Sequence, residues 1–166
     1  VLYQLTDLFT LFYLKFVKNN QGRDEHLWSN MIDSPTRRSW CGYSFEQLCL
    51  HHIPQIKIKL GIHGIQSDVC SWYLPAKDEN KGGQIDLLID RRDQVINLCE
   101  MKYSISPFEI TGRYNDEMQE RKELFRSSTK TRKALHLTMV TTYGLKNNAY
   151  SGMIQSEVIL DDLFKE

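Results

Sequence analysis

Two neighbouring segments rich in leucine, isoleucine and valine constrain the fold of this chain more than any other feature. Residues 84–90 and 94–103 are both strand-like, and the polar run Arg91–Asp93 between them predicts a tight turn. Apolar side chains occupy both faces of this hairpin, which is typical of strands that are covered on both sides. We therefore expect the hairpin to lie at the centre of a sheet.

The spacing of apolar residues predicts helices and further strands around the hairpin. A first long helix is expected over residues 43–59, capped by Ser44 and interrupted at Pro54. From residue 43 onward the predicted order is α, β, β, β, α, β, loop, β. The remaining expectations are a strand ending at 1–5, a helix over 7–18 capped by Thr6, short helices within 24–40, a strand over 65–74, a helix over 107–127, a strand over 135–142, a loop or short helix over 144–154, a strand over 157–160 and a last turn capped by Asp161.

The length of 166 residues suits one domain with a short additional segment. We divide the chain into an N-terminal helical connector, residues 1–40, and a main domain, residues 41–166. Because the chain begins at Val1, we expect it to be a fragment or a processed product of a longer polypeptide. The contents of 41% hydrophobic and 25% charged residues are ordinary for a soluble globular protein.

Several classes of protein are disfavoured by the composition. No stretch reaches the roughly 18 apolar residues of a membrane span. The four cysteines form no CxxC pair, so zinc-ligand spacing is absent, and a reduced, cytoplasmic protein is expected. The 21 basic residues balance the 21 acidic ones, so any contact with nucleic acid must come from local patches.

Polar side chains gather at the end of the hairpin that lies away from the turn. If Asp90 lies opposite Gln94, then Asp86 lies opposite Leu98, and all even-numbered residues share one face. A change of one residue in this register would separate the carboxylates. The polar set on the shared face is Gln84, Asp86, Glu100 and Lys102.

Two carboxylates held close together in a sheet repel each other, and a divalent cation such as Mg²⁺ relieves that repulsion. The nearby ammonium group of Lys102 can stabilise charge that develops on a phosphate. A metal-activated water attacking phosphorus is a reaction that such a set can run. Glu46, beside the apolar stripe of the first long helix, can aim at the same end of the sheet. The alternative is a structural network of ion pairs among Asp86, Glu100 and Lys102.

A basic group comprising Lys130, Arg132 and Lys133 precedes the strand expected over residues 135–142. Such a group can contact phosphates of a nucleic acid. The alternative is that these side chains simply complement the end of the preceding helix, where cations are common.

The hairpin motif resembles the core of the PD-(D/E)xK nuclease superfamily. The matching residues are Gly83-Gln84-Ile85-Asp86 and, after thirteen intervening residues, Glu100-Met101-Lys102. This resemblance implies an α/β, restriction-endonuclease-like αβββαβ core, with a central mixed sheet flanked by helices and an N-terminal helical extension. The literal Pro-Asp pair is absent, as it is in many relatives.

The resemblance also implies roles for individual residues. Glu46, Asp86 and Glu100 would be ligands of Mg²⁺ or Mn²⁺, with the Met101 carbonyl as a possible further ligand. Lys102 would be the catalytic lysine, and Gln84 would orient water or support the ligands.

A narrower resemblance covers essentially the whole chain. The segment from Gly83 to Lys102, with Thr131-Arg132-Lys133 and Thr141-Thr142-Tyr143-Gly144, is similar to the C-terminal region of bacterial and archaeal AAA+ ATPases of uncharacterised role. It implies a DNA endonuclease module joined to ATPase and winged-helix domains of the same full-length chain, with oligomers formed through the ATPase. No GxxxxGK[ST] motif occurs here. The alternatives are a catalytically inactive nuclease-like module that binds nucleic acid or assembles the ATPase, and a purely structural domain.

Overall fold

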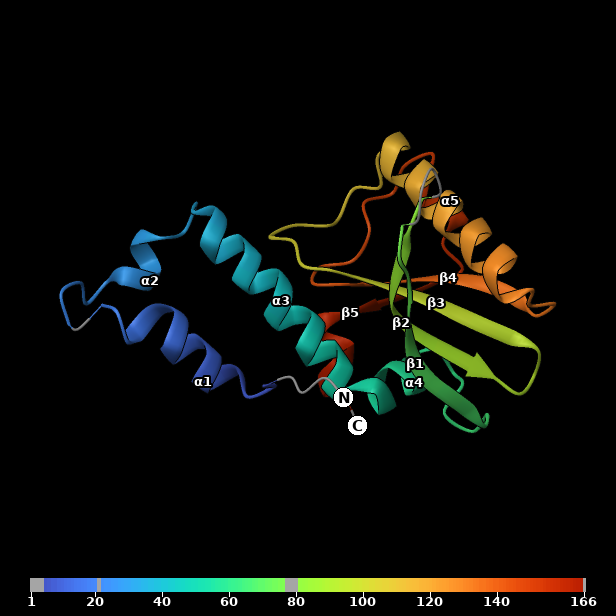
Figure 1. Ribbon diagram of the computed structural model, residues 1–166, viewed down its shortest axis with the longest axis horizontal. Coiled ribbons are helices and arrows are strands. Elements are labelled where there is room, and N and C mark those ends of the chain that lie inside the picture. Colours follow the sequence, from blue (N-terminus) through green and yellow to red (C-terminus); the bar gives the residue numbers. More distant parts are fainter. Residues whose placement is uncertain (1–4, 21, 77–80, 166) are drawn as a thin grey trace.

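The computed structural model describes residues 5–20, 22–76 and 81–165, and Figure 1 shows how its elements are arranged. The helical elements are α1 (Leu8–Phe12), the π-helical turn η1 (Tyr13–Val17), α2 (Leu27–Asn30), α3 (Pro35–His51), α4 (Ile53–Lys59), α5 (Gly112–Thr129) and the 3₁₀ turns η2 (Ser151–Met153) and η3 (Leu160–Phe164). The strands are β1 (Ser67–Leu74), β2 (Gly83–Arg91), β3 (Val95–Lys102), β4 (Ala134–Thr141) and β5 (Ser156–Ile159).

The five strands form one mixed sheet in the order β1-β2-β3-β4-β5. Strands β1, β2 and β3 are antiparallel neighbours, whereas β3, β4 and β5 run parallel. Helix α5 makes the crossover between β3 and β4, because parallel neighbours cannot be joined by a tight turn. The chain therefore has an α/β fold with N-terminal helices, consistent with the predicted αβββαβ core.

Both faces of the sheet are covered by helices, as the two-sided apolar hairpin predicts (Figure 1). On one face, Phe45 and Cys49 of α3 and Ile56 of α4 pack with Leu87, Ile89, Cys99, Met101, Val140 and Val158 of the sheet. On the other face, Phe125 of α5 packs with Ile85, Leu88, Ile96, Leu98, Leu135 and Leu137. The fully buried side chains at the centre of β2 and β3 explain why these segments show no simple polar alternation.

The hairpin register differs from the predicted one. Asp90 pairs with Ile96, not with Gln94, and Leu88 pairs with Leu98. The connecting residues are 92–94 instead of 91–93, and Gln94 has a left-handed backbone with φ of 69°. A left-handed third residue is usual in three-residue hairpin loops, but it is usually glycine, so the sequence carries no signal for it.

A β-bulge interrupts β2 near Asp86. Cys70 of β1 pairs with Leu88 of β2, and Trp72 pairs with Ile85. A step of two residues along β1 therefore matches a step of three along β2, so β2 contains one extra residue. Ile85 and Leu88 consequently pack on the same α5 face. The expectation that all even-numbered residues of the hairpin share one face is therefore wrong for β2, because one extra residue breaks the alternation.

The first long helix begins earlier than predicted. Ser34, not Ser44, caps α3 by accepting a hydrogen bond from the Arg37 amide, and Pro35 occupies its first turn. Helix α3 is thus continuous through residues 40 and 41. It ends at His51, and Pro54 lies in the first turn of the separate helix α4, where proline is tolerated.

The two chain ends also differ in detail from the expectations. Asp7, instead of Thr6, caps α1, and the last turn of this first helix is π-helical. At the other end Asp162, not Asp161, accepts the hydrogen bond from the Ile159 amide that begins η3. The strand expected to end at residues 1–5 falls largely outside the described residues.

Aromatic side chains join α1, η1 and α2 to the start of α3. Phe16 lies 5.4 Å from Trp28 and 5.6 Å from Trp40, measured between ring centroids, and Phe12 packs beside all three rings. Phe16 is 5% exposed, so this aromatic cluster is a small core of its own. Among the described residues, no helix is long and apolar enough to cross a lipid bilayer.

Candidate active site at one edge of the sheet

The predicted acidic residues and the lysine lie at the edge of the sheet where β2 begins and β3 ends. Asp86 belongs to the first half of β2, while Glu100 and Lys102 lie in the last three residues of β3. Helix α3 brings Glu46 toward the same edge from one face. The charges act on each other: Asp86 and Lys102 both shift the pKa values of Glu46 and of Glu100.

The bulge determines where Asp86 points. Its Oδ2 atom lies 3.5 Å from the Met101 amide nitrogen, so the side chain reaches across to the backbone of β3. Met101 itself is buried in the core under α3. Ile85, the residue before Asp86, packs on the α5 face, so alternation directs Asp86 toward the α3 side, and the bulge that follows keeps Leu87 on that side too.

Glu46 is a half-buried carboxyl group in the second half of α3. Burial raises its pKa, the nearby negative charge of Asp86 raises it further, and the Lys102 ammonium partly opposes both effects. Glu46 and Asp86 thus form a neighbouring pair of oxygen donors on the α3 side. Two such carboxylates are suited to a hard divalent cation.

Glu100 instead faces α5. It is 4% exposed, and its Oε1 atom forms an ion pair with Arg121. The Tyr114 hydroxyl lies 3.5 Å from Oε2 and donates to it. Burial raises the pKa of Glu100, although the hydrogen bond and charge of Arg121 counteract this effect. Arg121 therefore already neutralises the Glu100 carboxylate within the folded protein.

Lys102 follows Glu100 by two residues on β3 and lies beside it near α5. Its Nζ atom is 4.0 Å from Glu100 Oε2 and 5.7 Å from the centroid of the Tyr114 ring. The side chain is 36% exposed, so the ammonium group can reach solvent or a bound anion. Gln84 is exposed on β2, where it pairs with Tyr73 of β1 and lies two residues from Asp86.

The basic group at residues 130–133 lies away from these acids. Lys130 ends α5 in a left-handed conformation, and Lys133 forms an ion pair with Asp90 and donates to the Arg91 carbonyl at 2.8 Å. Ala134, the next residue, pairs with Val95 at the turn end of the hairpin. The structure therefore places Lys130, Arg132 and Lys133 at the opposite end of β3 from Glu100 and Lys102.

Two contributors at the acidic edge are not predicted from the sequence: Arg121 and Tyr114. Tyr114, Met118, Arg121 and Phe125 are spaced at four, three and four residues, so they share one face of α5. Met118 and Phe125 are buried on that face. An arginine within an apolar stripe signals a buried acidic partner, and the sequence contains that signal.

Among residues 5–20, 22–76 and 81–165, no three histidine, cysteine or acidic side chains are gathered closely enough to hold a metal ion. Glu46 and Asp86 fit a divalent cation as neighbouring donors. Glu100 faces α5, on the other side of the sheet, and is bound to Arg121, so its expected role as a ligand of the same ion stays a prediction. The contact between Asp86 and Met101 is made through the Met101 amide, so the expected role of the Met101 carbonyl stays a prediction.

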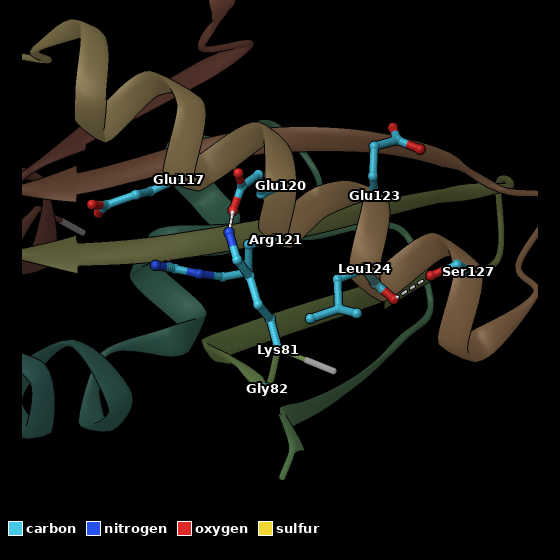
Figure 2. Close-up of a pocket in the computed structure, with 8 residues that line it drawn as sticks. All are labelled: Lys81, Gly82, Glu117, Glu120, Arg121, Glu123, Leu124 and Ser127. Atoms are coloured by element: carbon cyan, nitrogen blue, oxygen red, sulfur yellow. Dashed lines mark hydrogen bonds and ion pairs between the residues drawn. The ribbon is translucent and has the colours of Figure 1, made fainter. Parts of the chain in front are cut away.

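A surface hollow of about 650 Å³ lies beside α5, and Figure 2 shows its lining. Lys81 Nζ reaches Glu120 Oε2 at 2.8 Å across the hollow, while Arg121 turns away from them. Three acidic side chains, from Glu117, Glu120 and Glu123, line it together with these two cations. The excess of acidic over basic side chains in the lining disfavours a phosphate ligand, so the hollow does not extend the candidate site.

Comparison with known proteins gives little further information. No protein-family model matches the chain. No curated protein matches it either. A solved structure described as that of a protein of unknown function, AF1548, is similar over 67% of this chain and 56% of its own length, with 14% identity and a TM-score of 0.45. The chain thus spans little more than half of that protein, and a likeness this weak carries no functional argument.

Proposed function

We propose that this chain is a divalent-metal-dependent DNA nuclease module that hydrolyses phosphodiester bonds. The observation that supports the proposal most strongly is that Asp86 and Lys102 lie at the same end of β2 and β3, close enough for their charges to shift the pKa of Glu46, with Asp86 re-aimed by a bulge. Burying or crowding carboxylates without a compensating partner is costly, so such a pair beside a lysine indicates a function.

Each residue has a chemical role in this proposal. Mg²⁺ or Mn²⁺, when bound, supplies the charge that activates a water and polarises the phosphate. Glu46 and Asp86 provide its oxygen ligands. Glu100 faces α5 and pairs with Arg121, so it would join them only if it left Arg121 and the end of β3 turned its side chain toward the α3 side. Lys102, half-exposed beside them, stabilises the negative charge that develops on the phosphate oxygens. Gln84 orients water from the neighbouring position on β2.

The test is cleavage of single-stranded, duplex and branched DNA by the 166-residue chain with Mg²⁺ or Mn²⁺. Asp86→Asn and Lys102→Met are expected to lower the rate at least 100-fold, since charge stabilisation at a reacting group typically contributes about 10²–10³. Lys18→Met, which alters an exposed lysine at the end of η1, is the matched control and should retain activity. Inert wild-type protein on all substrates with both metals would count against the proposal.

A second candidate function is a catalytically inactive nuclease-like module. The ion pair between Arg121 and Glu100 favours it, because an internal guanidinium already neutralises one of the expected metal ligands. Under this alternative, calorimetry with Mn²⁺ shows no binding, and Lys102→Met leaves both folding and any DNA binding unchanged.

We further propose that the N-terminal helices join ATPase and winged-helix domains of a longer, cytoplasmic chain, which assembles through its ATPase. The support is an apolar surface on α1 and η1, where Phe9 is 77% exposed and Tyr13, Leu14 and Val17 are each more than 40% exposed. Hydrogen exchange would test this. Amides of residues 8–17 should be better protected in the full-length chain than in the 166-residue chain.

A further inference from the structure

Strands β1, β3 and β4, which lie on either side of β2, end at the same edge of the sheet as the candidate active site. Strand β1 is antiparallel to β2, which is antiparallel to β3, and β3 is parallel to β4. Strands β1, β3 and β4 therefore point in one direction. Each of them carries a tyrosine close to its final residue: Tyr73, Tyr103 and Tyr143.

These tyrosines are more exposed than packing alone requires. Tyr73 is 70% exposed, Tyr143 59% and Tyr103 38%. Tyrosine is enriched at interfaces, because its ring is apolar and its hydroxyl group remains polar. Isolated exposed apolar residues need no explanation, but three at one edge beside a charged cluster form a pattern.

Tyr73 and Tyr103 lie on the α3 side of that edge, the side to which Asp86 is directed. The Tyr103 ring is 6.4 Å from that of Phe45 on α3, and Tyr143 follows the end of β4, the strand next to β3. Tyr73 follows Trp72, whose ring packs 5.4 Å from Phe125 under α5. Because strand neighbours alternate, Tyr73 points to the opposite face.

Asp86 lies on β2, between the strands that carry Tyr73 and Tyr103. Tyr73 pairs with Gln84, two residues before Asp86, and Tyr103 directly follows Lys102. From β1 to β4 is three strand spacings of about 4.8 Å, or roughly 14 Å in total. That length corresponds to on the order of four nucleotides at about 3.4 Å each.

We propose that Tyr73, Tyr103 and Tyr143 form a stacking platform for the bases of single-stranded DNA, which passes over the Glu46 and Asp86 carboxylates. The inference rests on the proposed function for the nature of the substrate, and it specifies that substrate as unpaired DNA. Bases in a duplex are already stacked on each other, whereas the bases of a single strand have free faces for tyrosine rings.

Fluorescence anisotropy of a labelled oligothymidine of about twelve nucleotides, in EDTA so that no cleavage occurs, tests the platform. Tyr73→Leu and Tyr143→Leu should each weaken binding roughly 5- to 100-fold, since stacking on one aromatic ring contributes on the order of 1–3 kcal/mol. Tyr73→Phe and Tyr143→Phe retain the ring and should bind as the wild type does. Tyr13→Leu, at an exposed tyrosine of η1, is the control. Tyr103 is left unchanged because its ring packs near Phe45.

The outcomes separate this inference from the proposed nuclease function. Loss of oligothymidine binding in the leucine variants, with no cleavage by the wild type, supports the platform and refutes the nuclease. Wild-type-like binding by both leucine variants overturns the platform, even if DNA is cleaved. Absence of oligothymidine binding by the wild type, or equally tight binding of a matched duplex, also overturns it.

Discussion

At the scale of single residues, the acidic edge holds two kinds of carboxylate. Glu46 and Asp86 lie on the α3 side, where burial and mutual repulsion raise the pKa of Glu46. Glu100 lies on the α5 side, almost fully buried and bound to Arg121. Glu100 therefore has a structural partner already, while Glu46 and Asp86 retain the repulsion that a cation would relieve.

Arg121→Gln is expected to destabilise the protein by about 3 kcal/mol, because it leaves the buried Glu100 charge without its ion-pair partner. Urea unfolding monitored by tryptophan fluorescence measures the change. Arg126→Gln is the matched control, since Arg126 pairs only at 3.8 Å with the exposed Glu123 on the same helix, and it should cost well under about 0.5 kcal/mol. An equal effect of both substitutions would contradict a structural role for the Arg121 ion pair.

Asp162 makes stability depend on pH. Burial alone would raise its pKa, but hydrogen bonds from Lys165, the Ile159 amide and Lys59 outweigh burial and lower the pKa from its ordinary value of 3.8. Because the folded-state pKa lies below the unfolded one, the stabilisation is fully present above pH 3.8 and is lost as pH falls through the folded-state value.

The substitution Asp162→Asn should therefore destabilise the protein at pH 7, and the difference from the wild type should shrink as pH is lowered below about 4. Denaturant unfolding between about pH 7 and pH 3 measures it. Asp161→Asn, at the exposed neighbouring acid, should leave the pH profile unchanged. If the stability difference between the wild type and the Asp162→Asn variant stays constant across this range, the charge of Asp162 is not its cause.

At the scale of elements, apolar patterning predicts which segments form strands and helices but not how neighbouring strands align. The Leu, Ile and Val content of β2 and β3 identifies the hairpin, and the order of elements follows. The bulge at Asp86 and the left-handed Gln94 are not predictable in this way, because both depend on pairing with another segment and neither residue is glycine. By contrast, the Ser34-Pro35 start of α3 carries a readable capping signal, although the apolar stripe alone places the start of the helix later.

The same reasoning explains which parts of the site can be predicted. Asp86, Glu100 and Lys102 are found because a motif within two strands contains them. Arg121 contributes from a helix that follows later in the chain, so only the unusual arginine in its apolar stripe points to it. The basic group at 130–133 is predicted from charge alone, and charge does not specify which end of a sheet a residue reaches.

Gln94→Gly is expected to stabilise the hairpin by about 1 kcal/mol, because left-handed backbone costs side-chain-bearing residues roughly 1–2 kcal/mol and glycine nearly nothing. The φ of Gln94 is 69°, which lies in that left-handed region. Its backbone carbonyl, which accepts the Ala134 amide at 2.9 Å, is unaffected by the substitution. Thermal unfolding measures the gain, and Gln94→Ala, which keeps the strain, should give none.

At the scale of the whole molecule, helix α3 connects two cores. Its first half carries Trp40 into the aromatic cluster, and its second half carries Phe45 and Cys49 onto the sheet. The helix continues without interruption across residues 40 and 41, where the connector and the main domain were expected to meet. Helix formation is cooperative, because unfolding one turn removes backbone hydrogen bonds from the next. Unfolding of one core is therefore expected to destabilise α3 and, through it, the other core.

The two cores should therefore unfold together. Phe16→Ala removes a ring that is 5% exposed in the aromatic cluster and should cost about 3 kcal/mol. Urea transitions followed by far-ultraviolet circular dichroism, which reports on the whole chain, and by tryptophan fluorescence should shift to lower urea by the same amount. Phe9→Ala, at a ring that is 77% exposed, should shift neither. If Phe16→Ala instead splits unfolding into two transitions, the aromatic cluster is an independent unit, and α3 acts only as a tether between it and the sheet.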